Sequence, residues 1–329
     1  MANLMSLTAR YLCFRLLGLK MSNNTGVKHF YFIELSDLPA VHASLFVTIL
    51  LAYLTTLAGN GAILMATATD AHLQTPMYFF LCNLSLLDVL CPTVTVPKML
   101  QTFLSEDKRI SFIGCMLQLF FLIFVVGTEI FLLALMAYDR YVAICSPLHY
   151  TNIMSKRLCV QLAAGTWLTG FINSMVHTSM TFTLSFCGPN KINQYYCDIP
   201  QMKILSCSST YLAELVALLV AGILGGGAFL VTLISYIYII SAIFRMRSAE
   251  GRQKAFSTCG SHLAVVCLFY GTTIATYVRP TSTYSPKKDR IVSMLYGILT
   301  PMVNPMIYSL RNKEVKRALI KAFNIQRVF

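Results

Sequence analysis

The chain has 329 residues, of which 56% are hydrophobic and only 12% are charged. Soluble domains carry about 25% charged residues, so the composition excludes an ordinary soluble domain of this length. The net charge of +13 is spread over connectors and tails rather than gathered on one face. This distribution favours membrane topology over nucleic-acid binding, and we expect no nucleic acid among the partners.

Seven long apolar runs dominate the sequence, and short polar connectors separate them. A helix that crosses a bilayer needs about 20 mostly apolar residues, whereas a barrel strand needs about 10 of alternating polarity. The pattern predicts an all-α membrane protein, a seven-transmembrane helix bundle with its termini on opposite sides. The runs are Leu45–Thr67, Met77–Leu100, Ile113–Cys145, Leu158–Phe182, Tyr211–Phe244, Gln253–Val278 and Ile291–Leu310.

Distinct segments flank the bundle, which we predict over residues 41–311. Residues 1–40 are an N-terminal tail, and its first part, 1–20, is an atypical extension. Arg10 and Arg15 interrupt the apolar run of that extension, so it does not fit a signal peptide. Residues 312–329 place apolar side chains on one helical face and basic ones on the other. This predicts a short amphipathic cytoplasmic helix lying on membrane lipid, followed by a tail.

The orientation follows from a sequon and from cysteines, because Lys and Arg divide almost evenly between the two sides. Asn23 opens an N-glycosylation sequon, Asn23-Asn24-Thr25, which marks the N-terminus as extracellular when it is modified. Four cysteines fall on the same side, and an even set in an oxidising compartment predicts two disulfides. The residues alone leave all three pairings open among Cys115, Cys187, Cys197 and Cys207.

Charged side chains inside the apolar runs are candidate functional residues, since a buried charge in a membrane is costly. Asp139-Arg140 closes the third run, where an ion pair can be held in one state and released in another. Asp88 and Glu129 lie in the second and third runs. Two neighbouring carboxylates need a shared proton or a cation. A sodium ion is therefore one interpretation, and two separately hydrogen-bonded acids are the other.

Other functional classes lack their signatures. The chain has no metalloprotease or hydrolase motif and no metal-spaced cysteine pair, so we expect neither catalysis nor a transition-metal site, and no cofactor. A transporter would favour internal repeats, and seven runs do not divide into two halves.

Five motifs occur in a characteristic order along the chain. They are Pro76–Leu81, Met136–Cys145 with Asp139-Arg140-Tyr141, Ser235-Tyr236, Lys254–Leu263, and Pro301–Asn312 with Asn304-Pro305 and Tyr308. With the seven runs, they resemble the rhodopsin-like G-protein-coupled receptors. The finer motifs are similar to those of the olfactory receptors of the tetrapod-type branch, class II. The resemblance extends from about Asn23 to Lys321, and residues 1–20 depart from it.

This resemblance implies a plasma-membrane receptor for a small-molecule odorant, with an extracellular N-terminus and a cytoplasmic C-terminus. Its partner would be a heterotrimeric stimulatory G protein of the olfactory type, which raises cyclic AMP. The resemblance pairs Cys115 with Cys197 and Cys187 with Cys207, with Cys115–Cys207 as the alternative. It also implies a cytoplasmic switch around Arg140, formed by Asp139, Arg140, Tyr236, His262, Asn304, Pro305 and Tyr308.

The matched motifs also predict the ligand-binding residues, which lie on the third, fifth, sixth and seventh helices. This lining is apolar with a few hydroxyls, and it suits a small hydrophobic molecule. Leu122 stands where amine receptors carry a carboxylate, and the seventh run has no lysine for a retinal Schiff base. The predicted lining is Leu122, Ile123, Val126, Gly127, Val220, Leu224, Tyr270, Thr273, Ile274, Tyr277 and Met294.

Overall fold

The computed structural model describes residues 26–33, 39–277 and 286–311, together with 315, 317 and 320. Several predictions fall on other residues: the extension 1–20, the sequon at Asn23 and most of the helix over 312–329 lie outside the described part. The side chain of Tyr277 also lies outside it.

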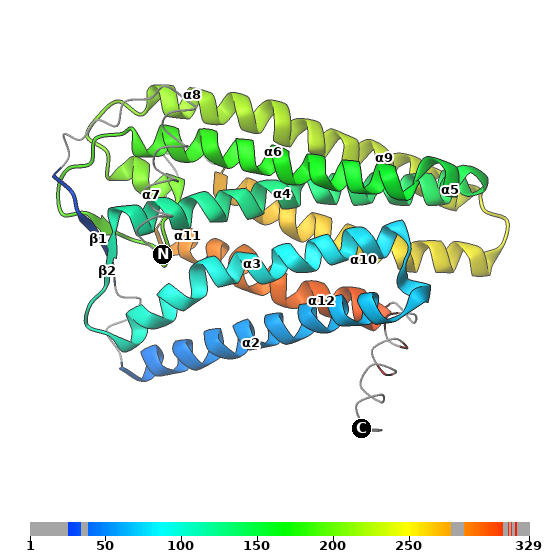
Figure 1. The fold of residues 1–329 in the computed structure, drawn as a ribbon, viewed down its shortest axis with the longest axis horizontal. Coiled ribbons are helices and arrows are strands. Elements are labelled where there is room, and N and C mark those ends of the chain that lie inside the picture. Colours follow the sequence, from blue (N-terminus) through cyan, green and yellow to red (C-terminus); the bar gives the residue numbers. More distant parts are fainter. Residues whose placement is uncertain are drawn as a thin grey trace.

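Seven long helical rods lie side by side in the described residues (Figure 1). The fifth and seventh are each two α-helices joined by a short π-helical segment, η3 (Ala221–Gly225) and η5 (Leu295–Leu299). In chain order the rods are α2 (Pro39–Thr69), α3 (Pro76–Leu104), α4 (Phe112–Cys145), α6 (Lys156–Phe182), α8 and α9 (Tyr211–Val220 and Gly226–Arg245), α10 (Ala249–Tyr277), and α11 and α12 (Pro286–Met294 and Thr300–Arg311).

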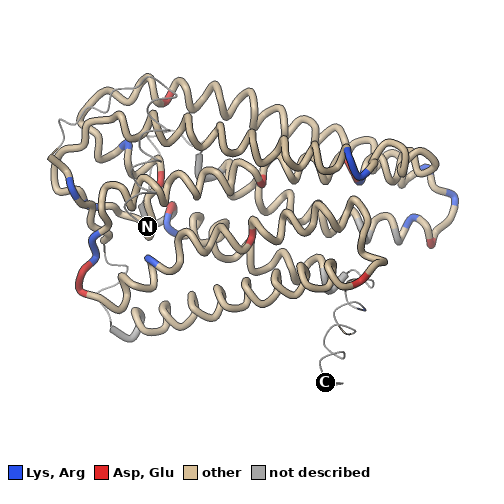
Figure 2. The backbone as a smooth tube through the Cα atoms, viewed as in Figure 1, with Lys and Arg blue, Asp and Glu red and all other residues tan. Residues whose placement is uncertain are grey.

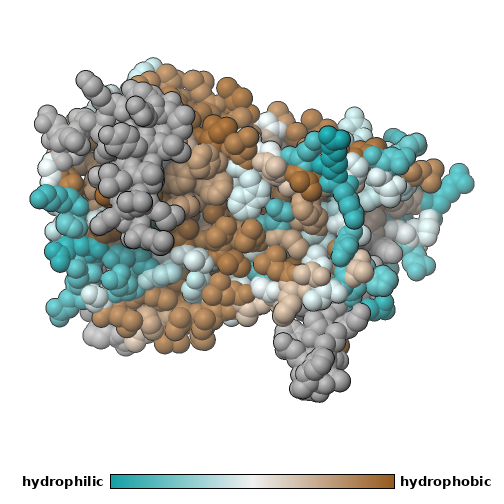
Figure 3. Space-filling model, in the orientation of Figure 1, coloured by the Kyte–Doolittle hydropathy of each residue, from teal (hydrophilic) through white to brown (hydrophobic). Residues whose placement is uncertain are grey.

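Five of these rods contain a segment that is long and apolar enough to cross a membrane. The segments are His42–Thr69, Pro76–Leu104, Phe112–Cys145, Tyr211–Arg245 and Asp289–Tyr308. The space-filling view agrees, since a broad hydrophobic belt separates two hydrophilic ends (Figure 3). Charged positions likewise gather toward both ends of the bundle (Figure 2). The structure therefore confirms five of the seven predicted spans by length and composition.

The two remaining rods, α6 and α10, are less apolar for identifiable reasons. The buried face of α6 consists largely of small and hydroxyl side chains, including Thr166, Gly170, Ser174 and Thr178. Such residues let helices approach closely inside a membrane bundle. The apolar part of α10 is only Cys259–Ile274, because its first turns are polar. That these two helices also cross the membrane stays a prediction.

Helix α4 is the central rod of the bundle. It contacts α3, α6, α9 and α10, and nineteen of its residues are buried, so it is covered by neighbours rather than by lipid. Ser111 caps its first turn, with Oγ accepting a hydrogen bond from the Gly114 amide at 3.0 Å. The 34 residues of α4 span about 50 Å at 1.5 Å per residue. One continuous helix thus connects the two ends of the molecule.

A proline in α12 explains an interhelical contact with α2. Pro305 has no N–H, so it leaves the carbonyl of Pro301 without its helical partner. The Asn60 side chain supplies one, because Nδ2 donates to that carbonyl at 3.1 Å. Gly59 makes room beside the ring, since a Cβ there would lie 3.0 Å from Pro305 Cγ. The carbonyl that the proline leaves free is thereby hydrogen-bonded by the neighbouring helix.

A small sheet covers one end of the bundle. Strand β1 (His29–Phe32) pairs antiparallel with β2 (Arg109–Ser111) and parallel with β3 (Lys191–Ile192), in the order β2-β1-β3. Phe30 is fully buried and packs against Phe112 and Phe186. The last part of the predicted N-terminal tail is therefore the central strand of this sheet, which sequence analysis did not anticipate.

Two N-terminal truncations test the roles of the extension and of strand β1 separately. We expect a chain lacking residues 1–20 to reach the cell surface like the full chain, because β1 begins at His29. A chain lacking residues 1–32 also loses the buried Phe30 side chain, whose removal costs about 3–5 kcal/mol, and its surface level should fall strongly. Flow cytometry of intact cells, with an antibody against an epitope tag fused to the N-terminus of each truncated chain, measures both. Equal loss in the two truncations would contradict this assignment.

Candidate ligand pocket and cytoplasmic switch

Two disulfides hold a lid made from the connector between α6 and α8. Cys115, near the start of α4, is bonded to Cys197, with their Cα atoms 5.5 Å apart. Cys187 is bonded to Cys207, with their Cα atoms 5.9 Å apart. The first disulfide ties the middle of the connector to the central helix, and the second closes a loop that contains β3 and the short helix α7 (Ile199–Ile204). The connector is thus fixed over one end of the bundle.

Buried hydrogen bonds attach the same lid to two helices. The Cys197 amide donates to Gln118 Oε1 on α4 at 3.0 Å. Gln194 Nε2 donates to Ser293 Oγ on α11 at 2.9 Å, and the hydroxyls of Tyr196 and Tyr296 lie 2.6 Å apart. Burial holds the pKa of Tyr196 well above its usual value, so its hydroxyl stays neutral. The lid is therefore linked to both α4 and the seventh rod.

The predicted ligand-binding residues differ in exposure. Leu122, Ile123 and Val126 are buried on α4. Tyr270 of α10 is also buried, and its hydroxyl donates to the Ile130 carbonyl at 3.4 Å. Ile274 is 47% exposed. The remaining positions with described side chains, Val220, Leu224, Thr273 and Met294, are partly buried.

Gly127 belongs to a helix interface. A Cβ at this position would lie 2.9 Å from Asn173 Nδ2 and 3.7 Å from the Gly170 Cα, both on α6. The missing side chain therefore allows α4 and α6 to approach each other. The role of Gly127 in ligand binding stays a prediction.

One of the two intramembrane carboxylates, Asp88, accepts hydrogen bonds from an amide side chain. Asn304 Nδ2 of α12 donates to both oxygens of Asp88 on α3, at 2.9 and 3.1 Å. Glu129 of α4 is buried and close enough to interact electrostatically with Asp88. Glu129 Oε1, Asn304 Oδ1 and Asn60 Oδ1 are buried without a hydrogen-bond partner among the described residues. These three oxygen acceptors are thus left unsatisfied by donors of the described residues.

At the opposite end of α4, Asp139 is the centre of a closed polar cluster. It is 1% exposed, it forms an ion pair with Arg140, and its Oδ1 accepts a hydrogen bond from the Tyr150 hydroxyl at 2.8 Å. Burial and the neighbouring Asp139 carboxylate raise the pKa of Tyr150, so the phenol remains a donor. Sequence analysis missed this role, although Tyr150 stands in the Pro-Leu-His-Tyr segment that follows the third run.

Three other predicted switch residues lie near Arg140, and no hydrogen bond among the described residues joins them to it; they are Tyr236, His262 and Tyr308. Tyr236 of α9 and His262 of α10 bond to each other, with hydroxyl and Nδ1 2.6 Å apart. Both interact electrostatically with Arg140, as does Tyr308 of α12. The Tyr308 hydroxyl and His262 Nε2 are buried and have no partner among the described residues. The surroundings of the paired Arg140 therefore include two buried polar atoms without a hydrogen-bond partner among the described residues.

Comparison with known proteins identifies the family. A family model described as olfactory receptor matches residues 49–326. Human olfactory receptor 5A1 is 48% identical over 310 residues, which cover 94% of this chain and 98% of that protein. Mouse olfactory receptor 5AR1 is 48% identical over 91% of this chain and 96% of its own length. Human olfactory receptor 5B21 is 48% identical over 92% of this chain and 98% of its own length. These matches cover the lid, the bundle and the Asp139 cluster, and the chain belongs to the olfactory receptor family.

Proposed function

We propose that this chain is an odorant receptor of the plasma membrane that crosses the bilayer seven times, with the N-terminus outside and the C-terminus inside. Binding of a small hydrophobic odorant within the bundle activates a stimulatory G protein of the olfactory type and raises cyclic AMP. The amphipathic segment over 312–329 lies on the inner leaflet, and Asn23 is glycosylated. Membership of the olfactory receptor family supports the receptor role.

One observation carries the link between binding and signalling. The same helix, α4, holds the disulfide-bonded lid at one end and the buried Asp139–Arg140–Tyr150 cluster at the other. α4 also packs against α9 and α10, which carry Tyr236 and His262. An odorant that changes how α4, α9 and α10 pack below the lid therefore changes the surroundings of Arg140. Differential contact of this kind is what a ligand needs to shift a conformational equilibrium.

The proposed odorant site uses apolar walls and few polar groups. We place Leu122, Ile123 and Val126 of α4 opposite Tyr270 of α10 in this site, with Val220, Leu224, Thr273, Ile274 and Met294 completing the lining. Such walls select by shape and by one or two hydrogen bonds. One methylene in an apolar pocket is worth only about 1–3 kcal/mol, so we expect a graded response to a series of related odorants.

The proposed switch starts from the closed cluster. In the resting state Asp139 holds Arg140, and Tyr150 donates to the same carboxylate. In the active state Arg140 leaves Asp139 and becomes available to the G protein. The hydroxyl oxygens of Tyr236 and Tyr308 then become its hydrogen-bond acceptors. The kink at Pro305 and the Asn304 contact with Asp88 set the position of Tyr308. The unpaired Tyr308 hydroxyl supports this step, because its oxygen can accept a hydrogen bond from the released guanidinium.

A cyclic AMP assay in cells that express the receptor, with a panel of small volatile molecules, tests the proposed function. We expect at least one apolar odorant to raise cyclic AMP in a concentration-dependent way, and cells without the receptor to remain silent. Removal of the stimulatory G protein should abolish the response. An odorant-gated current that persists without any G protein would instead show a channel.

Tyr150→Phe should raise basal signalling. The substitution removes one hydrogen bond to a buried carboxylate, which is worth about 1.5–3 kcal/mol, and it leaves the ring in place. If the bond exists only in the resting state, basal cyclic AMP should rise several-fold at equal surface expression. The matched control is Tyr138→Phe, which lies beside Asp139 on α4 but is 36% exposed; it should not change basal cyclic AMP. Unchanged basal cyclic AMP in Tyr150→Phe would show that Tyr150 does not help to hold the resting state of the proposed switch.

We also propose that a sodium ion binds between Asp88 and Glu129 in the resting state. The unsatisfied oxygens of Glu129, Asn304 and Asn60 support it, because hard cations prefer oxygen ligands. At tenfold excess over its dissociation constant, such a ligand stabilises by about 1.4 kcal/mol. Replacing choline chloride by sodium chloride should raise the unfolding midpoint of the purified receptor, and Glu129→Gln should remove that rise. Equal midpoints in both salts would favour two separately hydrogen-bonded acids.

A further inference from the structure

A surface groove of about 460 Å3 lies between α3 and α4, on the lid side of the bundle. We call it the outer groove. Two basic side chains stand at one end, and apolar side chains line the other. Its lining is Val94, Lys98, Arg109, Ile110, Ser111, Gly114, Leu117, Gln118 and Phe121.

The polarity of the outer groove runs along the helix axes. Lys98 lies near the end of α3, whereas Val94 is one turn further into the bundle. On α4, Leu117 and Phe121 follow Gly114 along one face, and those seven residues advance about 10 Å. Because α3 and α4 are both apolar enough to cross a membrane, the basic end lies at the lipid headgroups and the apolar end lies among the acyl chains.

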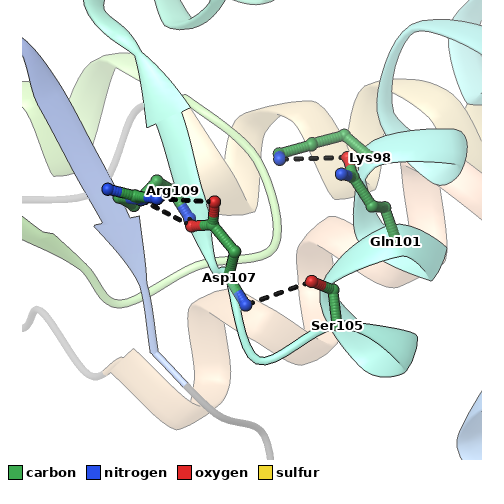
Figure 4. Close-up of polar contacts among 5 residues, drawn as sticks. All are labelled: Lys98, Gln101, Ser105, Asp107 and Arg109. Atoms are coloured by element: carbon green, nitrogen blue, oxygen red, sulfur yellow. Dashed lines mark hydrogen bonds and ion pairs between the residues drawn. The ribbon is translucent and has the colours of Figure 1, made fainter.

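The basic end has hydrogen-bonding capacity to spare (Figure 4). The Lys98 ammonium has three donors. Among the described residues it uses one of them, in a hydrogen bond to Gln101 Oε1 at 3.1 Å. Arg109 donates to Asp107 through Nε at 2.7 Å and through a terminal nitrogen at 3.0 Å. Two cations and one close carboxylate leave a net positive charge facing the groove, which suits a phosphate.

The carboxylates of the same connector are more exposed than Lys98. Glu106 and Asp107 follow the end of α3 and are exposed, so they stand further from the hydrocarbon than Lys98. Hydrogen bonds from Arg109 lower the pKa of Asp107 to about 2, and this carboxylate therefore stays ionised as the pH falls to about that value. Lys98 lies toward the bundle and the two carboxylates lie toward water, and this order of charges complements a phosphocholine headgroup.

We propose that the outer groove binds one phosphatidylcholine molecule of the surrounding leaflet. Its phosphate lies at Lys98 and Arg109, its choline faces the carboxylates, and one acyl chain follows the apolar end. The volume accommodates the phosphate, the glycerol and part of one chain rather than a whole lipid. This inference rests on α3 and α4 crossing the bilayer, and it does not depend on any odorant.

Native mass spectrometry of the detergent-purified receptor, titrated with dioleoylphosphatidylcholine, tests the proposal. We expect one tightly retained lipid and an affinity about tenfold weaker in Lys98→Gln, which removes a charge-assisted contact. Leu117→Trp, which fills the apolar end, should abolish retention. Lys191→Gln removes an exposed lysine from the same side of the molecule and should bind like the wild type.

Three results would overturn it. Equal affinity in Lys98→Gln and wild type would show that Lys98 only reaches the interface as an ordinary snorkelling lysine. Dioleoylglycerol bound as tightly as phosphatidylcholine would show that no phosphate is recognised. Oleate bound more tightly, with the same dependence on Lys98, would assign the groove to a fatty acid instead. Thermal unfolding of each variant, run in parallel, separates these outcomes from misfolding.

Discussion

Arg140→Ala should leave the receptor at the cell surface and abolish odorant-evoked cyclic AMP. Arg140 is the only cation in the cluster formed with Asp139 and Tyr150 among the described residues. A guanidinium offers five donors in a fixed geometry, and alanine offers none. If the released arginine is what the G protein meets, its loss removes the contact that active-state binding requires. The measurement is cyclic AMP against odorant concentration, normalised to surface receptor.

The control for Arg140→Ala is Arg157→Ala. Arg157 is an exposed basic residue at the start of α6, so its replacement changes the charge of the same end without touching the cluster. It should retain at least half of the wild-type response. Normal signalling by Arg140→Ala would refute the proposed switch, and equal loss in both variants would show a general effect of charge.

Gly170→Ala should lower receptor stability by about 1–3 kcal/mol and reduce the surface level in proportion. A Cβ at Gly170 would lie 2.9 Å from the backbone nitrogen of Thr128 and 3.0 Å from its Cα. Backbone atoms cannot rotate away as a side chain does, so α4 and α6 have to separate. Because α6 is the helix most closely packed on α4, and α4 also carries Arg140, the change should weaken signalling as well.

Gly165→Ala provides the matched control for that substitution. Gly165 lies on the same helix, and nothing lies within 4 Å of a Cβ built there. Both changes gain about 1 kcal/mol of helix propensity, so only the contact with Thr128 differs. The unfolding midpoint of purified receptor should fall in Gly170→Ala and hold or rise in Gly165→Ala. Equal midpoints would mean that the two helices are not as close as described.

The long helices could be predicted from the sequence because their signal is local. The predicted third run, Ile113–Cys145, differs by one residue from α4 at Phe112–Cys145. The fourth run, Leu158–Phe182, begins two residues later than α6. Twenty consecutive apolar residues have few structural alternatives in a bilayer. The same reasoning explains why five spans are clear by composition while α6, with its polar interface, is not.

Contacts between distant segments could not be predicted in this way. Strand β1 exists because His29–Phe32 pairs with residues of β2 and β3 that lie 78 or more positions away in the chain, and four residues alone carry no such information. The contact between Asn60 and the Pro301 carbonyl requires knowing that α2 lies beside α12. The role of Tyr150 depends likewise on the fold of its short connector.

The predicted site was informative about residue type and less so about direction. Asp139 with Arg140, and Asp88 with Glu129, stood out because charges are rare in apolar runs. Neighbouring positions on a helix face directions about 100° apart, since 3.6 residues complete a turn. Gly127 therefore faces α6 although Val126 is its neighbour, and spacing from a motif could not decide between lining and interface.

The most direct test of the seven-crossing bundle is to measure on which side of the membrane each end of the chain lies. Epitope tags placed before Ser22 and after Phe329, and a third at Arg247 between α9 and α10, can be read with antibodies in intact and permeabilised cells. We predict that the first tag is accessible in intact cells and the other two only after permeabilisation. Finding the first and last tags on one side would contradict a seven-crossing bundle, and with it the coupling of an outer odorant site to Arg140.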